Sequence, residues 1–137
     1  MKTIGYITLF LLIIMGSCKK EQETGPLELN KEVTLKTGDV RNLNPDNLSI
    51  KVLNINDSRC PIGVVCIWQG EATVTLEVKE TSSFDEAIGS VVLSTFHQPV
   101  DTVSGYIFRL IDVLPYPVYG VEVPEKDKKV VLKIDRI

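Results

Sequence analysis

Few side chains in this 137-residue sequence could carry out chemistry, because it contains only three cysteines and one histidine, His97. His97 lies near Asp101, and these two could form a catalytic triad with a serine. The candidates are Ser94 and Ser104, but neither lies in a nucleophile elbow of the form GxSxG. Zinc needs about four ligands, and neither a CxxC nor an HxxxH spacing accompanies His97. We therefore expect no catalytic residue, no bound metal and no cofactor.

The N-terminal segment is typical of an export signal. After Lys2, residues 4–15 form a mostly apolar run. A run of about twelve residues is too short for a bilayer core, which takes about 20 helical residues, so it indicates a signal-peptide core. Gly16, Ser17 and Cys18 follow it and resemble the cleavage box of bacterial lipoproteins. The resemblance implies cleavage after Ser17 and thioether lipidation of Cys18. The alternatives are a plain signal peptide and an uncleaved anchor, and in both of these Cys18 would carry no lipid.

This N-terminal pattern divides the chain into three parts. We expect a lipoprotein signal peptide at 1–17, a lipidated cysteine with a flexible tether at 18–30, and one domain at 31–137. Lys19 follows the cysteine, and a residue other than Asp there resembles the outer-membrane class of lipoproteins. The expected location is the cell envelope, anchored by lipid to the outer membrane of a two-membrane bacterium.

The other two cysteines, Cys60 and Cys66, predict a disulfide, because an even pair in an exported protein is normally oxidised. Closing a loop of about seven residues should stabilise the fold by only about 2–2.5 kcal/mol. The main expected effect is on local shape, through the directions in which Arg59 and Trp68 point.

The rest of the chain favours strands over helices. No stretch after residue 26 repeats apolar residues at helical spacing, whereas several alternate with the period of two that half-buried strands show. A single domain with only β structure is therefore expected. The six predicted strands are 33–37, 48–52, 72–78, 90–95, 106–113 and 130–134.

These six segments align as two sets of three at one constant offset of 58 positions, although any two β segments can be aligned to some degree. The apolar phase slips by one residue at Val52–Leu53 and again at Leu110–Ile111, which predicts a bulge or double-faced burial at both places. We expect pseudo-repeats at 31–78 and 89–136, each a three-stranded unit too small to bury its own apolar face. Together they predict a small antiparallel β-sandwich or barrel.

The cysteine segment carries a family resemblance. It reads DSRCPxxxxCIWxG over 57–70, and YxFxLxxVxPYP follows over 106–117. This pattern is similar to a group of small exported bacterial lipoproteins of unassigned function. The resemblance implies a β fold and an envelope location, and it offers no substrate, cofactor or catalytic residue.

The candidate binding residues lie on two matched loops, 57–70 and 114–128. Each residue also has a structural interpretation. Arg59 could pair with Asp57 or contact an anionic ligand. Trp68 could pack on the disulfide or face a ligand. The two tyrosines could contact a partner or cover the end of the fold. The candidates are Arg59, Trp68, Gln69, Tyr116 and Tyr119.

Charge and composition limit the classes of partner that this protein can bind. A net charge of −3 disfavours a nucleic-acid partner, which requires a basic surface. We expect a membrane-anchored envelope lipoprotein that binds or scaffolds a protein or a glycan without catalysis. The alternative is a hydrolase or protease inhibitor that acts on a peptide or cell-wall substrate, with His97 as its only imidazole.

Overall fold

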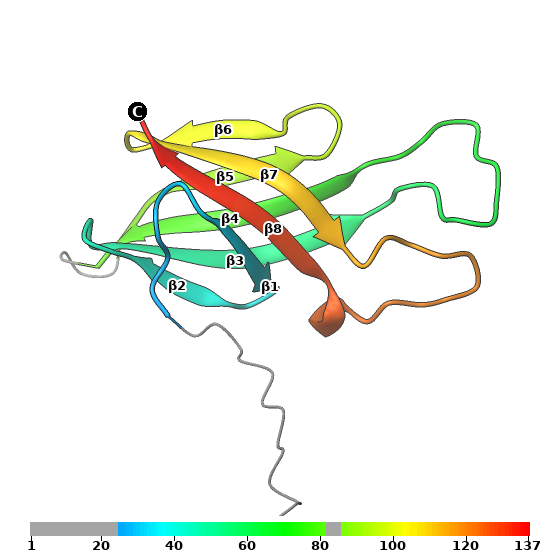
Figure 1. The fold of residues 1–137 in the computed structure, drawn as a ribbon, viewed down its shortest axis with the longest axis horizontal. Coiled ribbons are helices and arrows are strands. Elements are labelled where there is room, and N and C mark those ends of the chain that lie inside the picture. The colour runs from blue at the N-terminus through cyan, green and yellow to red at the C-terminus, as the bar shows by residue number, and fades with distance from the viewer. Residues whose placement is uncertain (1–24, 82–85) are drawn as a thin grey trace, which may run out of the picture.

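The computed structural model describes residues 25–81 and 86–137, and within them the chain forms eight strands and one short 3-10 turn (Figure 1). The expected signal peptide and Cys18 lie outside the described residues. The elements are β1 (Glu32–Lys36), β2 (Val40–Leu43), β3 (Leu48–Asp57), β4 (Ala72–Glu80), β5 (Ala87–Ser94), β6 (Val100–Val103), β7 (Tyr106–Leu114), η1 (Glu125–Asp127) and β8 (Lys129–Arg136).

In the described part of the chain, the strands form two antiparallel four-stranded sheets with the orders β2-β3-β4-β5 and β1-β8-β7-β6. The sheets are not closed into a barrel, so the all-β prediction is confirmed in its sandwich form. The expectation of three-stranded units is wrong, because the short strands β2 and β6 add a fourth strand to each sheet.

Buried and partly exposed residues alternate along the strands, and the buried ones form the core. In β4, Ala72, Val74, Leu76 and Val78 are buried, while the residues between them are partly exposed. The same pattern on the facing sheet places Phe108 and its neighbours against them. Burying each such large side chain stabilises the fold by about 1.5–3 kcal/mol, so the two apolar faces hold the sheets together.

The two phase slips in the sequence are bulges. The β3–β4 register shifts at Leu53, and the β7–β8 register shifts at Ile111. Both side chains point outward, with exposed fractions of 43% and 47%. An extra residue on one strand turns the following side chains back to the core face, which explains why Ile55 and Val113 are buried again.

The single offset of 58 is wrong for the third pair of strands. Ile50 pairs with Val78 on β4, whereas Phe108, 58 positions after Ile50, pairs with Ile134 on β8. Val78 and Ile134 differ by 56 positions, because 17 positions separate Asn56 from its partner Thr73, whereas 15 separate the equivalent Leu114 from its partner Lys129. Each sheet also contains strands from both predicted repeats. β1 of the first repeat pairs with β8 of the second, and β5 of the second repeat pairs with β4 of the first.

Residues 25–30, which the sequence placed in the expected tether, lie against the sandwich. Leu27 is buried in the core, and its N–H donates to the carbonyl of Asn42 over 2.8 Å. The N–H of Asn30 donates to the carbonyl of Ile134, also over 2.8 Å. The domain therefore begins by residue 27.

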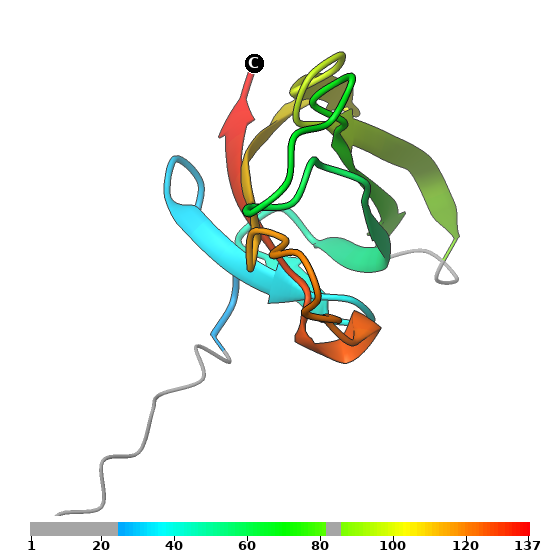
Figure 2. The same cartoon turned by 90° about the vertical axis from the view of Figure 1, so that its right-hand side faces the viewer.

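The loops that follow β3, β5 and β7 lie at one end of the sandwich (Figures 1 and 2). They span 58–71, 95–99 and 115–128, and we call these three loops the loop end. The first and third project beyond the sheets (Figure 1). The C-terminus lies at the opposite end.

Candidate functional site

Backbone hydrogen bonds join the two long loops of the loop end. The N–H of Ile62 donates to the carbonyl of Pro117 over 3.0 Å, and the N–H of Tyr119 donates to the carbonyl of Ile62 over 2.9 Å. Ile62 and Val118 thus form an isolated parallel bridge. Residues more than fifty positions apart therefore form one surface.

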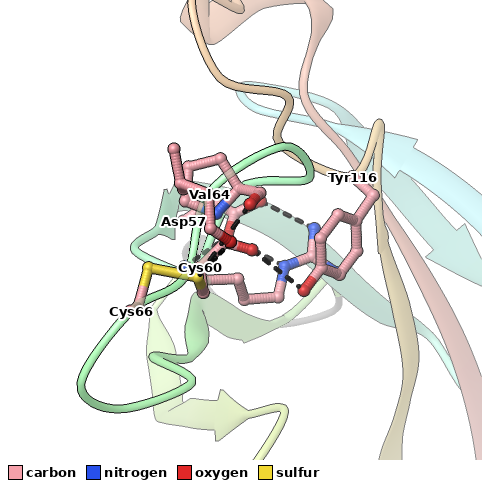
Figure 3. Close-up of a disulfide and its surroundings, with 7 residues drawn as sticks. Asp57, Cys60, Val64, Cys66 and Tyr116 are labelled. Carbon is pink, nitrogen blue, oxygen red and sulfur yellow. Dashed lines mark hydrogen bonds and ion pairs between the residues drawn. A yellow bond between two sulfur atoms is a disulfide. The ribbon is translucent and has the colours of Figure 1, made fainter.

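The predicted disulfide is present between Cys60 and Cys66, with their Cα atoms 5.9 Å apart (Figure 3). At the base of this loop, the N–H of Cys60 donates to the carbonyl of Gln69 over 2.7 Å. The N–H of Ser58 donates to the carbonyl of Glu71 over 2.9 Å. The bond and the two hydrogen bonds hold the loop as a closed unit.

Replacing both cysteines with serine is expected to lower the free energy of unfolding by about 2–2.5 kcal/mol, because the unfolded chain regains the freedom of a seven-residue loop. Urea unfolding of the oxidised parent and the Cys60→Ser/Cys66→Ser variant measures this change. Equal urea midpoints would contradict it and would show that the other contacts at the loop base hold the loop.

Arg59 connects the two halves of the site. Its Nε and Nη2 donate to the two carboxylate oxygens of Asp57 over 2.9 and 2.7 Å. Nη2 also donates to the carbonyl of Val113 over 2.6 Å, and Nη1 lies 3.4 Å from Oδ1 of Asp112. The side chains of Arg59 and Asp57 are only 8% and 7% exposed. The local ion pair considered from the sequence is therefore present, and it also reaches across to β7.

Tyr116 completes this contact. The guanidinium carbon of Arg59 lies 4.4 Å from the centre of the Tyr116 ring, and the Tyr116 hydroxyl donates to the carbonyl of Cys60 over 3.2 Å (Figure 3). Burial lowers the pKa of Arg59, but the hydrogen bond and charge of Asp57 outweigh burial and raise it above its usual value. Arg59 therefore stays charged and fixes the relative position of the two loops.

A small open hollow lies where the three loops meet. Its volume is about 190 Å³. Sites that enclose a small molecule measure roughly 300–1,000 Å³, so this hollow suits one projecting group of a larger partner. Its lining comes from all three loops and comprises Arg59, Gln69, Gly70, Thr95, Phe96 and Tyr116.

The structure divides the five predicted binding residues into two groups. Arg59, Gln69 and Tyr116 line the hollow, whereas Trp68 and Tyr119 are not part of its lining. Trp68 is 57% exposed and Tyr119 is 70% exposed, so neither packs into the core. Phe96, which is 56% exposed, was not among the predicted residues; an aromatic residue directly after the predicted strand 90–95 was the available signal.

His97 does not form the triad drawn from the sequence. Its Nδ1 lies 2.9 Å from Oε2 of Glu71, and the Ser94 hydroxyl donates to that same oxygen. Ser94 Oγ also accepts the N–H of Phe96 and of His97. The carboxylate thus lies between serine and histidine, whereas a catalytic triad needs the histidine in the middle. This cluster fixes the turn after β5.

The stability of this turn is expected to depend on pH. Hydrogen bonds from Ser94 and then from His97 lower the pKa of Glu71 below its usual value of 4.5. The ionised carboxylate therefore stabilises the fold above pH 4.5, and this contribution is lost as the pH falls through the lowered pKa. The melting temperature of Glu71→Gln should be below that of the parent at neutral pH and approach it below pH 4.5. The variant Glu122→Gln, at an exposed position, serves as the control. If the difference in melting temperature between Glu71→Gln and the parent did not change with pH, the stabilising role of the ionised Glu71 would be contradicted.

Within residues 25–81 and 86–137, no three His, Cys, Asp or Glu side chains are grouped so that they could hold a metal ion. The described part of the chain also has no helix long and apolar enough to cross a bilayer. Compared with known proteins, the sequence matches no protein-family model and no curated protein, and no solved structure matches it.

Proposed function

We propose that this protein is a lipid-anchored lipoprotein of the bacterial cell envelope, related to small exported lipoproteins, that binds or scaffolds a protein or a glycan without catalysis. The hollow at the loop end is its contact site. The observation that carries the proposal is the convergence of three loops, from both sheets, on one small open hollow.

The lining suits a projecting group of a larger partner. Phe96 and Tyr116 offer aromatic surfaces, on which a sugar ring or an apolar side chain can lie. The amide of Gln69 can both donate and accept a hydrogen bond. With about 190 Å³ available, one such group fits while the rest of the partner lies outside.

The loops are also held in place before any partner binds. Arg59 joins the base of the first loop to β7, and the disulfide closes that loop. Loops that are already ordered lose less conformational entropy on binding, which favours affinity. This arrangement supports a binding role for the loop end.

Export and anchoring have their own support. Disulfides persist mainly in oxidising compartments, so the Cys60–Cys66 bond fits a protein outside the cytoplasm. The acyl chains that such lipoproteins carry would provide stable membrane attachment through Cys18. Mass spectrometry of the mature protein should find an acylated N-terminal cysteine; an unmodified Met1 start would contradict the anchor.

Variants of the hollow test the binding proposal. The full lipidated chain, with Gln69→Ala and Phe96→Ala together, should retain less envelope protein or cell-wall glycan than the parent. Lys51→Ala, on the exposed outer face of β3, should retain as much as the parent. Equal retention by all three proteins would contradict the proposal. A hydrolytic activity of the parent that His97→Ala abolishes would instead favour the hydrolase alternative.

A further inference from the structure

A group of large apolar side chains is exposed on the outside of the two long loops. Val65 and Ile67 are fully exposed, at 101% and 109%, and the other members of the group are at least 57% exposed. We call this group the crest: Ile62, Val65, Ile67, Trp68, Tyr119 and Val121. It is distinct from the hollow, because none of its members lines the hollow.

The crest carries no charge. Neither 60–70 nor 115–121 contains Asp, Glu, Lys or Arg, in a chain of which 24% is charged. The nearest charged side chains in the first loop are Arg59, which is buried against Asp57, and Glu71, which pairs with His97. An uncharged apolar surface of this kind marks a contact with a protein or a membrane.

The shape and composition of the crest favour a membrane. The two long loops project beyond the sheets, and a protein could accept such a projection only in a matching groove (Figure 1). Lipids rearrange around a protruding group. Val65 and Ile67 are purely aliphatic, while Trp68 and Tyr119 are the residue types that gather at the membrane–water interface.

The backbone of the loops is suited to the same environment. Leaving a backbone N–H or carbonyl without a partner is costly in lipid. Here Ile62 is bonded through both its N–H and its carbonyl to the opposite loop, and the N–H of Val121 donates to the carbonyl of Val118 over 3.0 Å. Near the base, Cys60 and Gln69 are also bonded. These bonds reduce the cost of moving the residues that form them out of water.

The length of the tether keeps the domain near a bilayer. Seven residue steps separate Cys18 from Gly25, which allows a span of at most about 25 Å. Each of the ten residues of β3 adds about 3.3 Å, so the sandwich is longer than the tether. A second contact on the same membrane is then favoured by a high effective concentration.

We infer that the crest enters the interfacial layer of the bilayer in which Cys18 is anchored, as a second membrane contact that orients the domain. This inference rests on the lipid anchor of the proposed function, and it is independent of the partner in the hollow. Because the crest is uncharged, the contact does not require anionic lipid and persists at high salt.

Trp68, the only tryptophan of the chain, reports on this contact directly. The lipidated full chain is reconstituted in phosphatidylcholine vesicles, with and without brominated lipid. The expected results are a blue shift of Trp68 emission, quenching by brominated lipid and protection from iodide, at low and high salt. Val65→Asp/Ile67→Asp should remain with the floated vesicles through the lipid but lose the shift and the protection.

Control variants separate this inference from the proposed function. Ile137→Asp, exposed at the opposite end of the domain, and Gln69→Ala/Phe96→Ala, in the hollow, should both keep Trp68 protected. Three results would overturn the inference: Trp68 of the parent remains open to iodide, the aspartate variant stays protected, or protection requires added envelope protein. A chain that does not float with the vesicles would overturn both the crest contact and the anchor. Loss of partner binding with Trp68 protected would overturn only the function of the hollow.

Discussion

Replacing Arg59 with alanine is expected to lower the free energy of unfolding by about 3–5 kcal/mol, because it leaves a buried carboxylate without its counter-charge. Asp57 is only 7% exposed, and both of its carboxylate oxygens accept hydrogen bonds from Arg59. The carbonyl of Val113 also loses its short bond from Nη2. Each kcal/mol changes the melting temperature of a domain of about 100 residues by at least about 4 °C, so a decrease of about 12 °C or more is expected in calorimetry.

Two further variants show whether the stability that Arg59 provides comes from its geometry or from its charge. Arg59→Lys keeps the charge but cannot form the paired hydrogen bonds or lie flat on Tyr116, so it should recover only part of the loss. Lys31→Ala removes a lysine that is 70% exposed and pairs with Glu28, itself 64% exposed, and its cost should not exceed about 1 kcal/mol. If Arg59→Ala were as mild as Lys31→Ala, Arg59 would not hold the loops together.

Gly70→Ala is expected to destabilise the domain by about 3–5 kcal/mol, which is exceptional for one added methyl group. A Cβ at this position would lie 2.0 Å from the carbonyl oxygen of Ser58 and 2.9 Å from the Cα of Arg59. Both atoms belong to the backbone, so no side chain can move aside. The φ angle of +67° adds strain of about 1–2 kcal/mol for any residue with a Cβ. The urea midpoint measures the loss.

Gly120→Ala is the matched control for Gly70→Ala. Gly120 has a similar φ of +76°, but nothing lies within 4 Å of its Cβ position. It should therefore show only the strain of about 1–2 kcal/mol. If both variants lost the same stability, the close approach of Gly70 to Ser58 would have no energetic importance.

Most strands could be predicted from the sequence because one face of each is buried. β4 alternates without interruption, and the phase slips at Leu53 and Ile111 located both bulges. The strands β2 and β6 were missed because each has only four residues at a sheet edge, so too few buried positions repeat to show a pattern. The offset predicted for the third pair of strands was wrong by two positions, because a register difference of two residues leaves an alternation with a period of two unchanged.

The site was only partly predictable, for a different reason. Its local features, the disulfide and the Asp57–Arg59 pair, lie within a few residues of each other and could be proposed from sequence. The bond from Arg59 to Val113 spans 54 positions and depends on how the two sheets pack. Phe96 enters the hollow from a third loop, and no spacing in the sequence connects it with Gln69.

The most direct test of the binding role is photo-crosslinking in living cells, with a benzophenone amino acid in place of Gln69 in the lipidated full chain. Gln69 is exposed and lines the hollow, whereas Lys51, the control position, is exposed on the outer face of β3. A discrete adduct with a protein or with cell-wall glycan is expected from position 69, and none is expected from position 51. Equal adducts from both positions, or none from position 69, would contradict it.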